Sequence, residues 1–476
     1  MVRDRISRGP RDRVFTRVLT AALASLCVLV PVLVASAQGQ DAQEEVPHLL
    51  TLDEAMRLAI ERNPSIDAAQ SSLAAARAGL DGQRARRLPT LSFDADARTS
   101  ESLARTINVG GGTIRSGGGR STTSDVALTL SHTFYQSGRE EAIDEARART
   151  RASDLGIDDA QRRLLADVAS SFFSVLADQE LAEVADQAVA ASQTHLNLVD
   201  ARIEAGTVAP SDRLTVEAEL ADAQFEAVRT VNAVWTALAD LRTLLALPAD
   251  SLPLIRGSLD RDYPRGDLET WLAEALEARP DLRAQRERVR AGELALRQAK
   301  IDAGLSLSVQ GQADYGRHTG TTGDTWAVTG GLSFPLFNKQ ARASVDAARA
   351  NLDGTRQTLA QQELAASQQV SNAWYVLSDA GGRAVAAAAS VAASQTNLNA
   401  ARERYADGVA TIIEVTDAEL SWRRAQSNRV QALYDRNVAW YQLLAASGRS
   451  LLDEAAALTG SGQNTNELDA GTVENE

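Results

Sequence analysis

Apolar and small residues recur at helical spacing in two long stretches of this chain. The first stretch contains Leu165, Val168, Phe172, Val175, Ala185, Val189, Ser192, Leu196, Val199 and Ile203, and the second contains Val370, Trp374, Leu377, Val391, Ser394, Leu398, Ala401 and Tyr405. Steps of three and four residues place these side chains on one face of a helix, with an interruption inside each stretch. The pattern predicts coiled-coil-like helices.

Proline placement allows these helices to be very long. No proline occurs between Pro89 and Pro210, and none follows Pro335. Proline breaks helix interiors, so an uninterrupted helix of about 68 residues fits each stretch, and at 1.5 Å per residue it spans about 100 Å. Such a length suits a protein that crosses a compartment better than it suits an ordinary helical bundle.

Two glycines mark where each long helix is expected to end. Gly206 begins the segment Gly-Thr-Val-Ala-Pro-Ser, and Gly408 begins Gly-Val-Ala-Thr-Ile-Ile. Glycine adopts the left-handed conformation that commonly closes a helix, and a second helical stretch follows each turn. The sequence therefore predicts two helical hairpins, at 139–247 and 340–448, each with a short tip.

Four shorter segments change to a period of two, with alternating apolar and polar residues. They lie at about 90–98, 125–135, 304–314 and 325–335. Such alternation predicts β-strands with one apolar and one polar face. The alternating run within each segment has about 9–10 residues, the length of a tilted strand that crosses a bilayer. Loops are expected between the members of each pair, at about 98–124 and 316–324.

The chain also repeats itself. The segment Leu-Asp-Glu-Ala-Met-Arg-Leu-Ala-Ile-Glu-Arg-Asn-Pro ending at Pro64 returns as Leu-Glu-Thr-Trp-Leu-Ala-Glu-Ala-Leu-Glu-Ala-Arg-Pro ending at Pro280, and Ala-Ser-Gln-Thr-His-Leu-Asn at 191–197 returns with one change at 393–399. Two similar halves predict one fold with internal duplication. The expected divisions are a signal segment at 1–37, a linker at 38–49, repeat 1 at 50–250, a joining segment at 251–267, repeat 2 at 268–450 and a partly disordered tail at 451–476.

The first 37 residues are expected to be a secretory signal. Basic residues between Arg3 and Arg17 precede an apolar stretch, and the motif Ala-Ser-Ala ending at Ala37 fits cleavage before Gln38. A retained membrane anchor is the alternative. Cys27, the only cysteine, lies in this segment after a leucine, where a lipidation signal has a small residue. The mature chain would therefore contain no disulfide and no thiol.

The charge argues against nucleic-acid binding. The formal net charge of the 476-residue chain is −14, and it becomes −18 without the signal segment, which carries six Arg and two Asp. An acidic, exported chain is a poor partner for a phosphate backbone. No stretch after the signal has 18 consecutive apolar residues, so no membrane-spanning helix is expected there.

No residue pattern is typical of an enzyme or a metal site. His48, His132, His195 and His318 are scattered and lack metal-ligand spacing. The glycine cluster at 110–119 lacks the Lys-Ser/Thr ending of a phosphate loop, and no Gly-x-Ser-x-Gly motif occurs. We therefore expect no catalytic activity, no metal and no cofactor.

Two segments and the order of the predicted elements resemble a known family. Leu-Thr-Leu-Asp-Glu-Ala-Met-Arg-Leu-Ala-Ile-Glu-Arg-Asn-Pro at 50–64 is similar to the opening motif of the TolC-type outer-membrane factors of Gram-negative bacteria, and Arg-Tyr-Ala-Asp-Gly-Val-Ala-Thr-Ile-Ile-Glu-Val-Thr-Asp-Ala-Glu-Leu at 404–420 is similar to their second helical-tip motif. The resemblance covers about residues 50–450. It implies a mixed, mainly α fold with long helical hairpins in a trimeric α-barrel and a 12-stranded transmembrane β-barrel, four strands per chain.

The resemblance also implies a function and partners. A homotrimer in the outer membrane would serve as the passive exit duct of a tripartite efflux system, together with a periplasmic adaptor and an inner-membrane transporter. Four strands cannot close a membrane barrel, whereas three copies of four can close one around a polar lumen. Two alternatives stay open: the exit channel of a type I protein secretion system, and a soluble periplasmic coiled-coil adaptor.

Four residues near the tips are candidates for a periplasmic gate. By resemblance, Glu414 and Asp417 match positions that form acidic rings around the entrance, and Asp212 and Tyr405 match partners in contacts that hold the tips closed. Carboxylates clustered around one axis would raise the pKa of some of their members and would attract cations to the entrance. The alternative is that these acids lie in the first turns of the returning helices and complement the helix dipoles.

The tips themselves are candidates for docking the adaptor. Exposed turns must meet the partner, which singles out Gly206, Val208, Gly408 and Val409, although turn geometry alone explains the glycines equally well. The family often has a basic residue two positions after the second tip glycine, and here Ala410 stands there. The network that closes this channel is therefore expected to be weaker or built differently.

Overall fold

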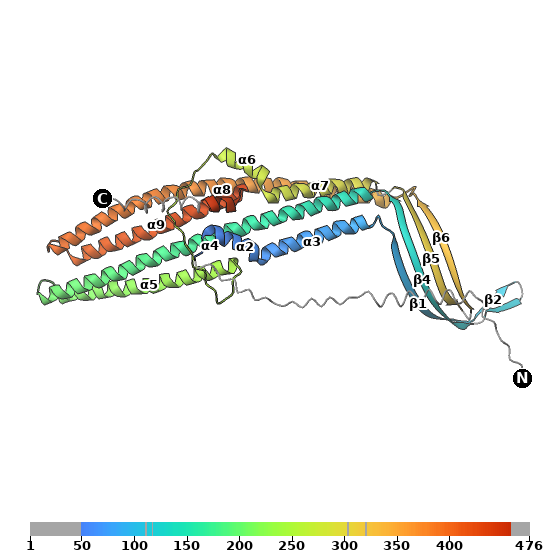
Figure 1. The fold of residues 1–476 in the computed structure, drawn as a ribbon, viewed down its shortest axis with the longest axis horizontal. Coiled ribbons are helices and arrows are strands. Elements are labelled where there is room, and N and C mark those ends of the chain that lie inside the picture. The colour runs from blue at the N-terminus through green and yellow to red at the C-terminus, as the bar shows by residue number, and fades with distance from the viewer. Residues whose placement is uncertain (1–48, 110–111, 117, 302–303, 319–320, 458–476) are drawn as a thin grey trace, which may run out of the picture. The chain divides into compact units, whose positions relative to one another are not determined.

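The computed structural model describes residues 49–109, 112–116, 118–301, 304–318 and 321–457. The expected signal segment, its cleavage position and the tail beyond residue 457 lie outside these described residues. In chain order (Figure 1), the elements are α2 (Leu52–Arg62), α3 (Pro64–Ala85), β1 (Thr90–Ser102), β2 (Arg105–Val109), β3 (Gly112–Ser116), β4 (Gly119–Gln136), α4 (Arg139–Glu204), α5 (Pro210–Leu244), α6 (Leu268–Ala278), α7 (Pro280–Ile301), β5 (Ser306–His318), β6 (Thr321–Ser333), α8 (Lys339–Ala406) and α9 (Ile412–Ser447).

The order of the elements repeats once. Each half begins with an 11-residue helix and a 22-residue helix, α2 and α3 in the first half and α6 and α7 in the second. Long strands follow, then a helix of 66 or 68 residues and a returning helix of 35 or 36 residues. The predicted internal duplication and the mainly helical fold are confirmed.

Local sequence explains where the first helices begin. Thr51 and Glu54 form a capping box at the start of α2, each side chain bonding the backbone of the other residue. The side chain of Asn63 caps α3, and Pro64 occupies its first turn. Backbone N–H groups in the first turn have no partner within the helix, so the N–H that proline lacks costs no hydrogen bond there. Pro280 starts α7 in the same way, so this boundary recurs in both halves.

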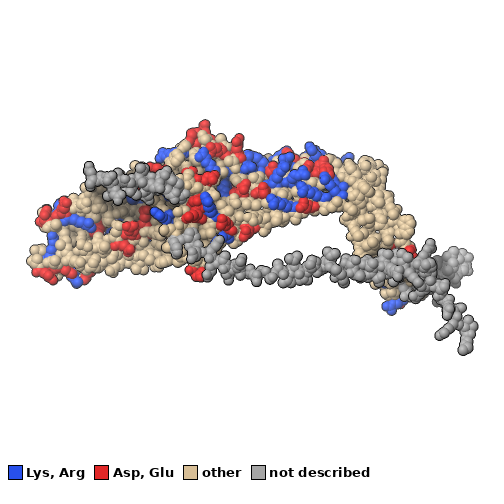
Figure 2. Space-filling view, in the orientation of Figure 1, with Lys and Arg blue, Asp and Glu red and all other residues tan. Residues whose placement is uncertain are grey.

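The four long strands form one antiparallel sheet in the order β1-β4-β5-β6. Phe93 pairs with Leu128, whereas Thr90 pairs with Ser131, so apolar pairs alternate with polar pairs along the ladder. Side chains of successive residues in a strand point to opposite faces, so the sheet has one apolar and one polar face. The apolar face carries the exposed side chains of Leu91, Phe93, Leu128, Leu130, Leu307, Val309, Trp326, Val328 and Leu332. Figure 2 accordingly shows few charged side chains over the sheet.

The strands are longer than the alternation predicts. They contain 13, 18, 13 and 13 residues, and β2 and β3 form an additional hairpin between β1 and β4. The expected loops at 98–124 and 316–324 are therefore wrong. Thr99 pairs with Thr122, and Gly316 pairs with Gly323. These small or polar residues pair through their backbones, and because their sequence lacks apolar alternation, the pattern does not predict that they belong to strands.

The helical core runs along the two predicted hairpins. α4 packs against α5, α3, α7 and α9, and α8 packs against α9 and α7. Figure 1 shows the hairpin of α4 and α5 beside the hairpin of α8 and α9. Buried positions of the predicted apolar pattern are Leu165, Val168, Phe172, Val175, Ala185, Ser192, Val199, Val370, Leu377, Leu398, Ala401 and Tyr405.

The segment that joins the two repeats is held against other parts of the fold. The amide of Leu50 donates to the carbonyl of Leu254 (2.6 Å), and the amide of Arg256 donates to the carbonyl of Leu50 (2.9 Å). Leu259 is fully buried, and the side-chain amide of Asn437 in α9 donates to its carbonyl (2.8 Å). The segment between α5 and α6 thus connects the start of the first repeat to the end of the second.

A glycine closes α9. Gly448 has a φ of 80°, and a Cβ atom at this position would lie 2.9 Å from the backbone nitrogen of Arg279. Residues 451–457 are helical and bury Leu451, so this part of the expected tail packs onto the fold. Gly448 is therefore needed for both its conformation and its small size.

Replacing Gly448 by valine is expected to lower the free energy of unfolding by about 2 kcal/mol or more, because a left-handed conformation and a backbone clash act together. Thermal unfolding of the purified protein, followed by circular dichroism, measures the change. Gly354→Ala is the control: it lies inside α8 with open space around it and should be neutral or slightly stabilising. Equal melting temperatures for Gly448→Val and Gly354→Ala would contradict the role of Gly448.

Candidate functional site at the helical tips

Both helical hairpins turn at a glycine in the left-handed conformation. Gly206 has a φ of 72°, Gly408 has a φ of 74°, and the amide of Gly206 donates to the carbonyl of Ile203 (2.9 Å). Val409 is 79% exposed, whereas Val208 is half-buried. Turn geometry therefore explains the two glycines, and adaptor docking at the valines stays a prediction.

An apolar cluster, here called the tip core, joins the two hairpins behind these turns. Its buried members are Val199, Val216, Leu398, Ala401, Tyr405, Ile412, Val415 and Ala418, which come from α4, α5, α8 and α9. Ala410, at the position where a basic residue is common in the resembled family, packs against this cluster. The tips of the two hairpins are thus packed together within one chain.

Arg202 connects the first hairpin to the second. Its guanidinium donates to the backbone carbonyls of Tyr405 (2.9 Å) and Ala406 (3.0 Å), and it lies over the Tyr405 ring, 4.3 Å from the ring centre. These carbonyls belong to the last turn of α8, where a positive charge complements the helix dipole. Arg202 therefore holds the end of α4 against the end of α8.

The structure does not bring Asp212 and Tyr405 together within one chain. The Tyr405 ring is buried beneath Arg202, and among the described residues its hydroxyl has no hydrogen-bond partner. Asp212 is half-buried in the first turn of α5, where the Ser211 hydroxyl donates to its carboxylate (3.4 Å). Their part in a gate therefore stays a prediction.

The two acids of the second tip lie at the start of α9. Glu414 forms a capping box with Thr411, and Arg404 lies 3.7 Å from its carboxylate. Asp417 is exposed one turn further along the helix. Glu414 thus has the capping role that its helix position suggests, and a role of both acids in rings around an axis stays a prediction.

Directly beside the tip core lies a set of buried and half-buried ionisable side chains, here called the ionic layer. It consists of His195 from α4, Glu219 from α5, Arg402 from α8, and Glu419 and Arg423 from α9. His195 Nδ1 lies 3.5 Å from a carboxylate oxygen of Glu419, and Arg402 lies 3.6 Å from the same oxygen. Arg423 lies 3.6 Å from the Glu219 carboxylate. All four long helices contribute to this layer.

Burial dominates the titration of the layer. Burial raises the pKa of Glu219, and the neighbouring Glu419 raises it further, although a hydrogen bond from Thr416 (3.2 Å) opposes this. Burial also raises the pKa of Glu419, against the attraction of Arg402 and Arg423. Burial lowers the pKa of His195, and Glu219 partly offsets this. The sequence pattern does not group these residues, because their helical spacing does not distinguish buried charges from solvated ones.

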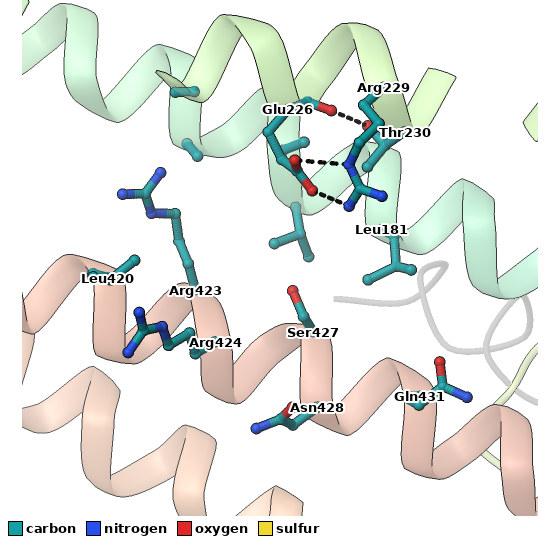
Figure 3. Close-up of a pocket in the computed structure, with 14 residues that line it drawn as sticks. Leu181, Glu226, Arg229, Thr230, Leu420, Arg423, Arg424, Ser427, Asn428 and Gln431 are labelled. Atoms are coloured by element: carbon teal, nitrogen blue, oxygen red, sulfur yellow. Dashed lines mark hydrogen bonds and ion pairs between the residues drawn. The ribbon is translucent and has the colours of Figure 1, made fainter. Parts of the chain in front are cut away.

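A groove of about 530 Å³ continues between the two hairpins beyond the ionic layer. Figure 3 shows Arg423, Arg424 and Asn428 of α9 on one side and Glu226 and Arg229 of α5 on the other. Arg229 donates to the Glu226 carboxylate (2.9 Å), so these two charges are already paired. The lining mixes charged, polar and apolar groups in an open groove rather than an enclosed pocket.

Two further kinds of feature, a metal site and a membrane-spanning helix, are not found in the described part of the chain. No group of three or more His, Cys, Asp or Glu side chains there could hold a metal ion. Of the helices in the described ranges, none is long and apolar enough to cross a membrane.

Comparison with solved structures gives the fold. The chain is similar to the outer-membrane channel OprN with a TM-score of 0.70 and 20% identity, covering 86% of this chain and 94% of that chain. It is also similar to the open state of the Neisseria gonorrhoeae MtrE outer membrane channel, with a TM-score of 0.69, 23% identity, and coverage of 84% and 89%. The predicted likeness of fold is confirmed.

Comparison with sequences gives the family. The chain is 27% identical over 402 residues to the pyoverdine export outer membrane protein OpmQ of Pseudomonas putida, covering 81% of this chain and 84% of the relative. The model of the family described as "Outer membrane efflux protein" matches residues 55–247 and 271–449, which include both sets of long helices and strands. This is a family of transport proteins rather than enzymes. Because the match spans well over half of the sequence, the chain belongs to the outer membrane efflux protein family, whose members are channels of the Gram-negative outer membrane.

Proposed function

We propose that this chain is the passive exit duct of a tripartite efflux system and works as a homotrimer. The observation that carries the proposal is the sheet, which has one apolar and one polar face and, in the described chain, leaves the outer edges of β1 and β6 unpaired. Open strand edges are not tolerated in lipid. Three copies would pair every edge in a twelve-stranded barrel with its apolar face toward lipid and a polar lumen.

The helices support the same assembly. Apolar side chains on α5 and α8 are exposed in the single chain, among them Phe225, Val228 and Trp235 on α5 and Tyr375 and Val385 on α8. Exposed apolar stripes at helical spacing are typical of surfaces that pack against a partner. Neighbouring copies would cover these stripes and close a tube of helices that continues from the barrel into the periplasm.

Energy and selectivity would come from partners. An inner-membrane transporter would drive the cargo, and a periplasmic adaptor would link that transporter to the tips, where the exposed Val409 offers an apolar contact. Asp212, Tyr405, Glu414 and Asp417 would form the gate that this contact opens. Val208, Gly206 and Gly408 would contribute the shape of the docking surface.

The cargo is proposed to be a small molecule. The relative OpmQ is named for pyoverdine export, which favours small-molecule efflux over type I protein secretion. Family membership favours a channel over a soluble periplasmic adaptor. A proton-driven exporter encoded beside this gene would support efflux, whereas an ATP-binding exporter would favour the secretion alternative.

Reconstitution tests the proposed channel directly. The purified full chain is expected to migrate as a trimer in detergent and to form ion-conducting pores in planar lipid bilayers. Deletion of its gene should sensitise the cell to compounds that the neighbouring transporter exports, and the intact gene should restore resistance. A monomer that never inserts into bilayers would overturn the proposal.

The gate assignment makes a separate prediction. Asp212→Asn and Tyr405→Phe are each expected to raise single-channel conductance severalfold, because each removes a polar group assigned to contacts that hold the tips closed. Tyr375→Phe is the matched control, since this tyrosine lies on the same helix as Tyr405 but away from the tips, and the substitution keeps the ring that would pack against a neighbouring copy. Unchanged conductance in both Asp212→Asn and Tyr405→Phe would remove these residues from the gate.

A further inference from the structure

The ionic layer crosses the interface between the two hairpins. The His195–Glu419 contact joins α4 to α9, and the Arg423–Glu219 contact joins α9 to α5. The Thr416 hydroxyl also donates to Glu219 across the same interface (3.2 Å). Any motion that separates the hairpins at this level must therefore break these contacts and expose the layer to water.

The contacts compensate the buried charges poorly. Glu419 is fully buried and Glu219 is nearly so, yet the distances to Arg402 and Arg423 are longer than a hydrogen bond. Among the described residues, several buried polar atoms of the layer have no hydrogen-bond partner: both carboxylate oxygens of Glu419, Oε1 of Glu219, Nδ1 of His195, and Nε of Arg402 and Arg423. Ion pairs held this loosely do not offset the loss of water around two carboxylates.

The arginines are placed differently from the acids. The side chains of Arg402 and Arg423 are 40% and 20% exposed, whereas those of Glu419 and Glu219 are 0% and 6% exposed. If a carboxylate of the layer became neutral, each arginine would still reach water and no buried cation would be left unpaired. The unfavourable desolvation therefore lies with the two carboxylates.

We propose that the ionic layer weakens the packing of the two hairpins against each other, so that they separate readily when the channel opens, and that protonation of Glu219 and Glu419 tightens this packing. The proposal rests on the proposed function, in which the tips must part. The tip core and Arg202 would hold the hairpins together, while the carboxylates next to them oppose this packing. If the ion pairs of the layer instead stabilised the packing of the hairpins, neutralising Glu219 or Glu419 would loosen the packing rather than tighten it.

The sign of the pH effect follows from burial. Packing of the hairpins raises the pKa of Glu219 and Glu419 above the usual 4.5. Protonation of the two acids therefore stabilises the packed state fully below pH 4.5, and this stabilisation is lost as the pH rises through the raised pKa values. His195 acts in the opposite sense. Burial lowers the pKa of His195 below 6.5, so the packed state favours the neutral ring. Protonation of His195 therefore destabilises the packed state as the pH falls through the lowered pKa. The acids are therefore tested in a His195→Gln background.

Hydrogen exchange of the full-length protein in detergent tests the proposal. Glu219→Gln and Glu419→Gln keep the side-chain volume and remove the charge. Because each removes a poorly compensated buried charge, exchange of the amides at 192–199 in α4 and 415–423 in α9 should slow at pH 7 by about tenfold. Glu217→Gln is the matched control on α5, where the carboxylate pairs with Arg213 near the surface, and it should leave the rates unchanged.

Two outcomes would overturn the proposal: faster exchange in both glutamine variants, or rates equal to those of the control. In the His195→Gln protein, lowering the pH from 7 to 5 should slow exchange of the same amides beyond the intrinsic pH effect, and this response should vanish when both acids are glutamine. A response that persists without the acids would refute their part in it. These measurements need no conducting pore, so a failure of the channel proposal would show separately in bilayers.

Discussion

Replacing Arg202 with methionine is expected to raise the open probability of the channel by roughly 30-fold. The side chain donates two charge-assisted hydrogen bonds to carbonyls of the opposite hairpin and lies over the Tyr405 ring. Because Arg202 is half-buried, solvent weakens these contacts, and their loss is taken as about 2 kcal/mol. Since 1.4 kcal/mol corresponds to a tenfold change, the equilibrium shifts by roughly 30-fold. Methionine retains the aliphatic packing of the arginine stem.

The internal duplication supplies a matched control for this prediction. Arg404 lies 202 residues after Arg202 at the same level of the second hairpin. Its side chain is 55% exposed, and its ion pair with Glu414 is 3.7 Å long, so Arg404→Met should change the open probability by about twofold or less. Single-channel recordings give both values, and cells carrying Arg202→Met should take up large antibiotics more readily. Equal effects of the two variants would contradict the role of Arg202.

The helical part of the fold was predictable from the sequence. The long proline-free stretches and the apolar steps through Val168, Phe172 and Val199 correspond to buried positions of α4, and the tip glycines lie in the turns. Helix interiors have a strong sequence signal, because one side is buried over many turns. The repeated segments ending at Pro64 and Pro280 also showed that both halves share one order of elements.

The sheet was only partly predictable. The alternation through Leu91 and Phe93 marks one face, but β1 continues through Arg98 and Thr99 to Ser102, where every residue is polar or charged. Backbone pairing with β4 holds these residues in the sheet, and pairing leaves no mark in the sequence of one strand. The expected loop was therefore too long, and the β2–β3 hairpin was missed.

The candidate site was the least predictable part. Tyr405 was singled out, but its partner Arg202 was not, because a contact between residues about 200 positions apart depends on how the hairpins pack. Glu219 and Glu419 lie on helices rich in solvated acids, and only the three-dimensional structure shows that they are buried. The proposed gate roles of Asp212 and Glu414 depend on contacts with neighbouring copies in the trimer, and such contacts leave no pattern in the sequence.

An aromatic cluster ties the joining segment and α6 to α9. Trp440 of α9 is 2% exposed, stacks on Tyr263 with ring centres 5.0 Å apart, and meets Trp271 edge-on at 6.0 Å. Large aromatic side chains contribute more buried area than any other residue type, and aromatic pairs add further stabilisation. Trp440 therefore connects α9 to the joining segment and α6, which are adjacent to each other and distant from α9 in sequence.

Replacing Trp440 by alanine is expected to lower the free energy of unfolding by about 3–5 kcal/mol, because a large cavity remains between Tyr263 and Trp271. Trp440→Phe keeps an aromatic ring and should cost about half as much. Thermal unfolding by circular dichroism measures both variants, and hydrogen exchange should show the loosening first at 251–278. Since the strands and the tips lie away from this cluster, correctly inserted Trp440→Ala protein should keep the conductance of the unchanged chain. A melting temperature equal to that of the unchanged chain would show that the cluster does not hold these parts together.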